Sequence, residues 1–301
     1  MNCIGVVVTY NRKGLLLENL RMLRKQSRQL NKVIIIDNHS TDGTQELVCK
    51  EFKDCLNWID YRYMAENYGG AGGFYYGVKF AYESGADAIW LMDDDGKPFK
   101  EDTFEMIMNV AEKLYIENHS LFLNSLVTFD GKNLSFGFWP TKSQEQQLKK
   151  INDEKKENIL YGKANPFNGT LVTREVVGRI GYPRKEFFMS RDETDYLKRS
   201  QEAGAIIATV TDSVYCHPAS KLIYKKIGGY ATQIYDNLDK EYYFMRNLTY
   251  TYKGRNNIKI AGFVALRVIT ILLYENQKSK RIVQIKKAIN DAKHERMGKR
   301  K

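Results

Sequence analysis

The sequence is poor in cysteine and lacks the spacings that would make its cysteines metal ligands. Its 301 residues contain 4 cysteines, with no C-x-x-C pair and no zinc-type spacing. Scattered thiols of this kind are typical of reduced intracellular proteins, so we expect a cytoplasmic location. The N-terminal residues also lack the basic leader and the cleavage site of a secretion signal. We therefore expect the chain to begin with a buried strand.

The apolar stretch 262–274 is too short to span a bilayer by the usual criterion. It covers about 13 residues against the ~20 that a spanning helix needs, and Arg267 interrupts it. Lysine and arginine flank it, as in amphipathic helices that lie on anionic membranes. A helix packed on the rest of the protein, or in a homo-oligomer interface, explains the pattern equally well. Both interpretations stay open, so the protein is expected in the cytoplasm, free or peripheral on the inner face of the plasma membrane.

The sequence has fewer acidic than basic residues. The chain has 47 Lys plus Arg against 36 Asp plus Glu, a formal net charge of +11. Such an excess favours an anionic partner: nucleic acid, an acidic membrane face or a phosphorylated substrate. With 43% hydrophobic residues, the composition is that of a folded soluble protein. The length suits one large domain, or one domain with an appendage.

Apolar segments alternate with helical patterns, which predicts an α/β fold around a mostly parallel sheet. Strands are expected at 4–8, 33–36 and 88–92, and helices at 15–26, from 44, at 74–84, 193–203 and 258–274. Polar clusters follow the strands at 9–12, 37–43 and 93–95. Because ligands bind beyond the carboxyl ends of parallel strands, these clusters should meet at one rim.

Two later segments change in character. Residues 143–158 are strongly polar, which predicts a mobile loop or a solvated helix. After His217 the chain becomes basic and aromatic. We therefore divide it into a ligand-binding catalytic domain, residues 1–220, and a basic, mainly helical C-terminal region, residues 221–301, ending in a basic tail.

Glycine is concentrated in NYGGAGG, residues 67–73. The run matches neither the dinucleotide fingerprint nor the P-loop. It reads either as a mobile turn or as a loop whose backbone approaches a diphosphate. The helix expected directly behind it favours the second interpretation.

Three aspartates, Asp93 to Asp95, end the apolar strand AIWLM. Charge runs usually lie in solvated turns, but at least one of these carboxylates must be partly desolvated and needs a cation. Mg²⁺ and Mn²⁺ take oxygen ligands and often bridge carboxylates to substrate phosphates.

Two further sites carry candidate chemistry. Asp192, Glu193 and Asp195 begin a predicted helix, where they either cap the helix or provide a general base. His217 follows a predicted strand and is either structural or a metal ligand on the same rim.

Taken together, these motifs resemble glycosyltransferase family 2, whose members have the nucleotide-sugar-binding GT-A fold. The resemblance rests on VVVTYNR, IIIDNHSTDGT, ENYGGAGGF, WLMDDDGKP, FNG, FFMSRDETDY and the late histidine, in family order over residues 6–217. NYGGAGGF and YYFMRNLTY look most like the branch of bacterial galactofuranosyltransferases and rhamnosyltransferases. The resemblance implies an inverting, metal-dependent transfer of a sugar onto a glycan or lipid-linked glycan in cell-surface polysaccharide synthesis, such as O-antigen.

The resemblance also assigns donor-binding residues. The uridine or thymidine end of the donor would be held by Thr9, Arg12 and Asp37. The diphosphate and sugar would be lined by Asn67, Gly69, Gly70, Ala71, Gly72 and Gly73. UDP-galactofuranose is the first choice of donor and dTDP-rhamnose the second.

The remaining roles concern the metal, the base and the acceptor. Asp93, Asp95 and His217 would hold Mn²⁺ or Mg²⁺, with Asp94 turned to the donor sugar. Glu193 would be the catalytic base, with Asp192 as the alternative. Asn168 and Gly169 would line the acceptor site, where Thr170 and Leu171 replace the tryptophan pair of the mycobacterial galactofuranosyltransferases, so a different acceptor is implied.

Two other classes remain as alternatives. A nucleic-acid-binding protein would use the positive charge, but the acidic triplet on the rim argues against nucleic acid as a partner. A sugar nucleotidyltransferase should carry a basic, glycine-rich loop after the first strand, and VVVTYNRKG has a single glycine.

Overall fold

The computed structural model describes residues 1–300, apart from the side chain of Cys55. Its centre is a nine-stranded sheet of order β3-β2-β1-β4-β8-β6-β9-β5, with β7 paired to β9. The strands are β1 (Cys3–Thr9), β2 (Lys32–Asp37), β3 (Ile59–Tyr63), β4 (Ala88–Asp93), β5 (Lys97–Pro98), β6 (Leu121–Thr128), β7 (Ile159–Tyr161), β8 (Thr170–Thr173) and β9 (Ile206–Cys216).

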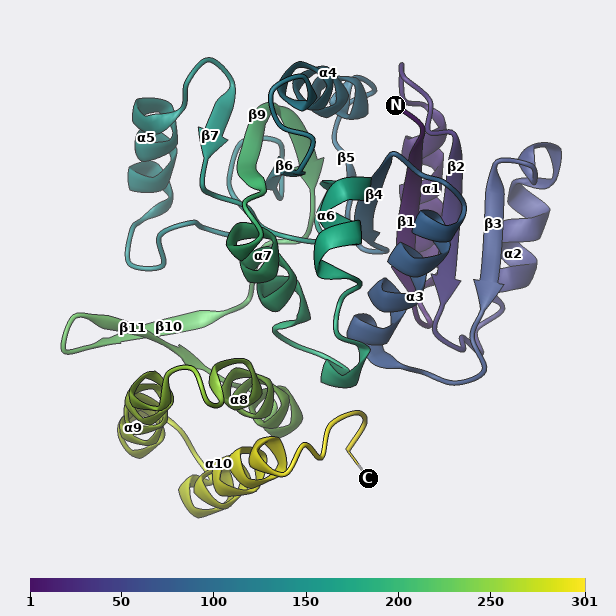
Figure 1. Ribbon diagram of the computed structural model, residues 1–301. Helices are drawn as coiled ribbons and strands as arrows, with labels where there is room; N and C mark the ends of the chain where they lie inside the picture. The colour runs from purple at the N-terminus through teal and green to yellow at the C-terminus, as the bar shows by residue number, and fades with distance from the viewer. Residues whose placement is uncertain (301) are drawn as a thin grey trace.

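Helices cover both faces of this sheet, and the C-terminal helices form a separate group below it (Figure 1). The helices are α1 (Lys13–Arg24), α2 (Thr44–Glu51), α3 (Gly69–Glu83), α4 (Thr103–Tyr115), α5 (Gln144–Glu154), α6 (Arg174–Ile180), α7 (Asp192–Glu202), α8 (Leu238–Tyr252), α9 (Asn257–Tyr274) and α10 (Lys278–Lys293). Short 3₁₀ turns lie at Lys53–Cys55 and Lys185–Phe187.

The two layers follow from the alternation of side chains along each strand. Along β1, Val7 packs with α1 and α4 in one apolar cluster, while Val6 and Val8 pack with α3 and α6 in the other. Strands β3, β2, β1 and β4 are all parallel. The predicted α/β fold is confirmed, with antiparallel strands β8, β5 and β7 added in the other half of the sheet.

The predicted rim is confirmed by the strand register. Thr9 pairs with Asp37, and Val8 pairs with Asp93, so the ends of β1, β2 and β4 lie side by side. The polar clusters that follow these strands therefore meet at one edge of the sheet.

The glycine run corrects the prediction of a loop followed by a helix at residue 74, because α3 already begins at Gly69. The reason is close packing on the sheet. A Cβ atom on Gly73 would lie 2.4 Å from Val8 Cγ1, and one on Gly77 would lie 2.3 Å from Val6 Cγ1. Helix propensity disfavours glycine, but here contact with β1 requires it.

The C-terminal region contains more structure than predicted. Residues 223–234 form a β-hairpin, β10 (Ile223–Ile227) and β11 (Tyr230–Ile234), and the expected basic tail contains α10. The polar segment 143–158 is mostly α5, which begins with a capping box at Ser143 and Gln146. Helices α8, α9 and α10 and the hairpin form what we call the C-terminal module.

We predict that Gly77→Ala lowers the free energy of unfolding by about 1–3 kcal/mol, because the added methyl overlaps Val6 and forces α3 away from β1. Denaturant unfolding measures this. Gly262→Ala is the matched control: it also lies inside a helix, with no atom within 4 Å of the added methyl. It should stabilise by about 0.5–1 kcal/mol. Equal effects at the two positions would contradict the packing explanation.

Candidate active site

The aspartate triplet at the end of β4 is held by side chains from two other strand ends. Thr9 Oγ1 donates to Asp94 Oδ2 at 2.7 Å, and Arg12 Nη1 donates to Asp94 Oδ1 at 3.1 Å and to Asp95 Oδ2 at 2.9 Å. His217 Nε2 lies 3.1 Å from Asp95 Oδ1. The carboxylates are thus compensated by one arginine and one imidazole within the protein.

The electrostatics differ across the triplet. Burial raises the pKa of Asp93 to about 8, and the charges of Asp95 and Asp94 add to the rise. Burial also raises the pKa of Asp94, against the bonds from Thr9 and Arg12. For Asp95, burial raises the pKa, but the hydrogen bond and charge of His217 outweigh burial, so the pKa of Asp95 is lowered. Asp93 therefore carries the most poorly compensated carboxylate of the three.

The predicted donor-binding residues near β1 and β2 are held by hydrogen bonds within the protein. Asp37 is fully buried; its carboxylate accepts from the Ser40 amide at 2.7 Å and from the Tyr61 hydroxyl. Thr9 and Arg12 hold the triplet. Asn67 Oδ1 accepts from the Gly69 amide at 2.8 Å, which fixes the start of α3.

Within the glycine run, the structure separates positions packed against other parts of the protein from one that faces the cavity. Ala71 and Gly73 are buried, and a Cβ on Gly72 would clash with Tyr68. A Cβ on Gly69 would lie 1.9 Å from the carbonyl oxygen of Phe188, so no side chain fits there. Gly70 has open space around it and lines the cavity described next.

A cavity of about 870 Å³ brings the remaining candidates together. Its lining includes Gly70, Asp93, Asn168, Asp192, Glu193 and His217, which come from five separate segments of the chain. Gly169 lies behind Asn168 with φ +67°, and a Cβ there would meet the Tyr215 ring at 2.8 Å. Positions that the sequence spreads over about 150 residues thus share one volume.

Asp192 and Glu193 begin α7 and differ in environment. Asp192 is 5% exposed, and burial, followed by the charge of Glu193, raises its pKa well above the usual range. Both side chains line the cavity. Asp195 is separate: it accepts from Arg184 at 3.1 Å and Arg199 at 2.8 Å, which makes it structural.

The metal prediction is met in part by the geometry. His217 and Asp95 touch, but within residues 1–300 no three His, Cys, Asp or Glu side chains are grouped as a metal cage. The donor set itself fits a divalent ion, because it offers carboxylate oxygens and an imidazole nitrogen. The unbalanced carboxylate of Asp93 is consistent with a further cation at this point.

The sequence analysis did not identify the aromatic side chains in the cavity wall or the hairpin residues that also line the cavity. The Phe136 ring packs against His217 with ring centroids 4.9 Å apart and the planes tilted by 50°, and Phe138 also belongs to the lining. The run SFGFWP carried this signal. Leu222 and Tyr224, from the start of the hairpin, also line the cavity.

Comparison with known proteins supports the resemblance to glycosyltransferase family 2. The model of the family "Glycosyl transferase family 2" matches residues 6–160. Galactofuranosyltransferase GlfT1 of Mycolicibacterium smegmatis is 30% identical over 82% of this chain and 81% of its own length. The dTDP-rhamnosyl transferase RfbF of Shigella flexneri is 24% identical over 93% of this chain and 90% of its own.

A solved structure shares the fold. The mannosyltransferase PcManGT of Pyrobaculum calidifontis, in complex with GDP-Man and Mn²⁺, aligns with a TM-score of 0.53 and 15% identity. The alignment covers 97% of this chain and 75% of that one.

We predict that His217 titrates above the ~6.5 of an unperturbed histidine, because the carboxylate of Asp95 outweighs the burial that lowers its pKa. The charged imidazole then contributes stability below the unfolded-state pKa, and this contribution is lost as pH rises through the folded-state value. Imidazole NMR signals, followed in chelator-treated buffer, measure the midpoint.

Asp95→Asn is expected to lower that midpoint, because it removes the neighbouring charge. The signals of His119 and His294, which lie on other elements, serve as the internal reference. An unchanged His217 midpoint in the variant would contradict the ion pair.

Proposed function

The chain belongs to glycosyltransferase family 2, and we propose that it transfers galactofuranose from UDP-galactofuranose onto a hydroxyl of a glycan or lipid-linked glycan, with inversion. The observation that carries the proposal is the single cavity that holds Asp93, Glu193 and His217. Its similarity to a galactofuranosyltransferase supports this donor. The second candidate is dTDP-rhamnose, supported by the similarity to RfbF.

Glu193 is proposed as the general base. It lies at the N-terminal end of α7 and lines the cavity. There it takes the proton of an acceptor hydroxyl as that oxygen attacks the anomeric carbon and the nucleotide diphosphate leaves. A single displacement inverts the anomeric centre. Asp192 is buried, and burial together with the charge of Glu193 raises its pKa, whereas Glu193 is only partly buried in the cavity wall, which favours Glu193 for this role over Asp192.

Asp93, Asp95 and His217 are proposed to hold Mn²⁺ or Mg²⁺. The Mn²⁺ complex of a structural relative supports this choice. When bound, the ion neutralises the diphosphate and stabilises the leaving nucleotide as a Lewis acid. The remaining donor contacts are proposed for Thr9, Arg12, Asp37, Asn67, Asp94 and the residues from Gly69 to Gly73, and acceptor contacts for Asn168 and Gly169.

We predict that UDP release from UDP-galactofuranose requires a divalent ion and falls at least about 100-fold in Asp95→Ala and Glu193→Ala, because each removes a group acting on the reacting atoms. The assay is a panel of nucleotide sugars with Mn²⁺, Mg²⁺ or chelator. Glu202→Ala is the matched control, since Glu202 ends the same helix and is exposed.

Undiminished turnover in both Asp95→Ala and Glu193→Ala would contradict the proposed mechanism. Turnover with dTDP-rhamnose but not with UDP-galactofuranose would replace the donor and leave the mechanism standing. Full activity in the presence of chelator would contradict the proposed requirement for a divalent ion.

A further inference from the structure

Helix α9 is apolar along its length, yet little of it is covered. In the part of the chain that the structure describes, it is the one helix long and apolar enough to cross a membrane, and 17% of it is buried. Its uncovered apolar side chains include Ile258 (87% exposed), Ile269 (42%) and Leu272 (49%), which recur at helical spacing.

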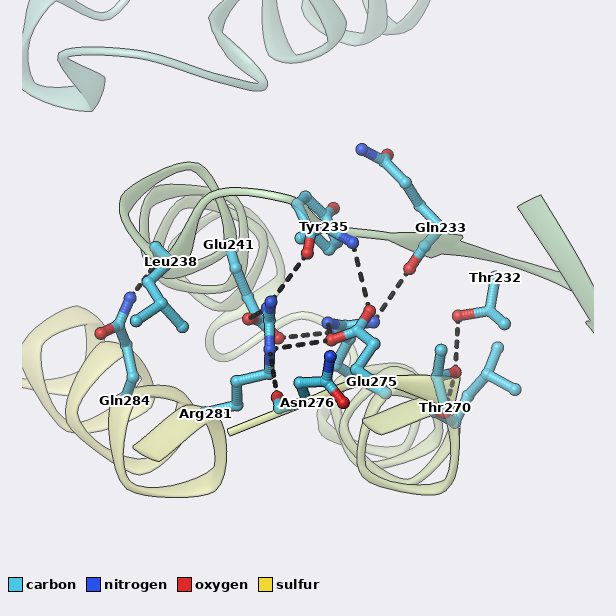
Figure 2. Close-up of polar contacts among 12 residues, drawn as sticks. Thr232, Gln233, Tyr235, Leu238, Glu241, Thr270, Glu275, Asn276, Arg281 and Gln284 are labelled. Atoms are coloured by element: carbon cyan, nitrogen blue, oxygen red, sulfur yellow. Dashed lines mark hydrogen bonds and ion pairs between the residues drawn. The ribbon is translucent and has the colours of Figure 1, made fainter. Parts of the chain in front are cut away.

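Polar contacts fix this helix to the C-terminal module. Arg267, in mid-helix, is buried and donates to Glu241 Oε1 at 2.6 Å and to Glu275 Oε2 at 2.5 Å. Arg281 joins the same network, which lies between α8, α9 and α10 (Figure 2). Crossing a bilayer would break these buried ion pairs, at high cost. The helix therefore lies along the surface of the module.

The hairpin extends this apolar surface. The Lys225 ammonium lies 5.7 Å from the centre of the Tyr274 ring, and the Thr232 and Thr270 hydroxyls are 2.8 Å apart, so hairpin and helix are neighbours. We call the exposed apolar side chains of these two elements the docking face: Leu222, Ile223, Tyr224, Tyr230, Ile258, Phe263, Ile269, Leu272, Leu273 and Tyr274.

The charges around the docking face have one sign. Segments 221–235 and 253–274 contain lysine and arginine but no aspartate or glutamate. In a two-fold dimer this face would meet itself, so lysines would oppose lysines. An anionic membrane instead matches the apolar side chains, the flanking lysines and the interfacial tyrosines together.

The docking face also borders the active site. Leu222 and Tyr224 line the large cavity. Tyr224 lines a second cavity as well, of about 180 Å³, which lies between the hairpin, α8 and α9 and has Phe244, Phe263 and Leu266 in its wall. The Tyr235 hydroxyl, also in that lining, is buried with no partner in the described chain.

We propose that the docking face binds an anionic membrane surface, so that a lipid-linked acceptor reaches the active-site cavity past Tyr224 while part of its lipid chain occupies the small cavity. This rests on the proposed glycosyltransferase function and names the class of its acceptor. It explains why an apolar helix and a basic hairpin lie at the mouth of the site.

The test is sedimentation with vesicles of phosphatidylcholine, with or without phosphatidylglycerol. Wild-type protein should bind the mixed vesicles. Ile258→Ser/Leu273→Ser and Lys225→Glu/Lys226→Glu should each weaken binding at least about tenfold, because the first variant removes apolar side chains from the docking face and the second reverses charges that would meet anionic lipid. The matched controls, Ile116→Ser and Lys50→Glu/Lys53→Glu, change exposed side chains at the end of α4 and around α2 and should bind as wild type.

A second measurement, UDP release in the absence of vesicles, distinguishes failure of membrane docking from failure of the proposed function. The docking-face variants should keep it, because their residues lie outside the cavity lining. If the wild-type protein releases UDP from the donor but does not bind anionic vesicles, the membrane-docking proposal is overturned and the proposed function stands. A dimer seen by sedimentation velocity and lost in Ile258→Ser/Leu273→Ser, without vesicle binding, would assign the face to a second copy.

A different observation concerns the loop before the proposed base. Phe188, Ser190 and Arg191 have φ values of 64°, 65° and 69°. Non-glycine residues rarely adopt this region, and such strain persists where the surroundings over-determine it. The loop leads directly into Asp192 and Glu193.

Asn247 of α8 holds this loop. Its side chain is fully buried, and its amide nitrogen lies 3.1 Å, 2.9 Å and 2.8 Å from the carbonyl oxygens of Phe187, Met189 and Ser190. Arg246 Nε donates to Asn247 Oδ1 at 3.1 Å, which turns the amide nitrogen toward the loop. Arg246 also donates to the Phe187 carbonyl at 3.0 Å.

We infer that Asn247, oriented by Arg246, is a positioning residue for the proposed base: it fixes the strained loop and so sets where Glu193 lies. In Asn247→Asp a carboxylate oxygen replaces the donor at the same size and faces three carbonyl oxygens. We expect kcat to fall about 10- to 100-fold, as for small misplacements of catalytic groups, with KM for the donor nearly unchanged.

Asn290→Ala, an exposed change on α10, is the control and should leave kcat and KM unchanged. If Asn247→Asp fails to fold, Arg246→Lys keeps the charge but loses the bond that orients the amide, and should lower kcat in the same direction. A folded Asn247→Asp with wild-type kcat would overturn the inference. So would equal losses in donor binding and kcat, because a purely structural role would produce them.

Discussion

Three adjacent carboxylates at the end of a buried strand are the constraint on which the site depends. Negative charges that lose water need a positive or hydrogen-bonding partner. The protein supplies Thr9 and Arg12 from the end of β1 and His217 from beyond the end of β9. Because β1 and β9 lie on opposite sides of β4 in the sheet, the strand order itself is what makes this compensation possible.

The C-terminal module is tied to the same site through the loop that precedes α7. Phe188 packs in an apolar cluster with Tyr242, Tyr243 and Ile271, all of the module. The carbonyl oxygen of Phe188 accepts from the Ala71 amide at 3.2 Å, so the same residue also meets the start of α3. The two sequence regions on either side of the proposed division at residue 220 therefore pack together at this loop.

The sequence predicted the rim well because its signals are local. A β-branched run followed by Asp or Thr marks a strand and its end, and parallel pairing then forces Thr9, Asp37 and Asp93 together. The start of α3 was missed because glycine propensity points to a loop, whereas contact with Val6 and Val8 decides the outcome. Gly228 and Gly229, both with positive φ, carried a hairpin signal that the basic composition obscured.

Other features could not be read from the sequence, because they depend on partners far away in the chain. The motif YYFMRN suggested a family branch, but only the fold shows that Asn247 reaches the carbonyl oxygens of residues 187, 189 and 190. Likewise, the resemblance placed Asp95 and His217 in one site, but their direct 3.1 Å contact is known only from the fold.

The charge distribution explains how a protein of net charge +11 keeps an acidic site. Asp94 is buried and Asp93 and Asp95 are partly buried at the sheet rim, where a lowered dielectric strengthens their interaction with a cation bound beside them. The lysines of the hairpin and α9 are exposed, where salt limits their reach to about 8–10 Å. The two sets therefore do not cancel. The acids give the cavity its negative charge, while the bases give the exposed surface of the hairpin and α9 its positive charge.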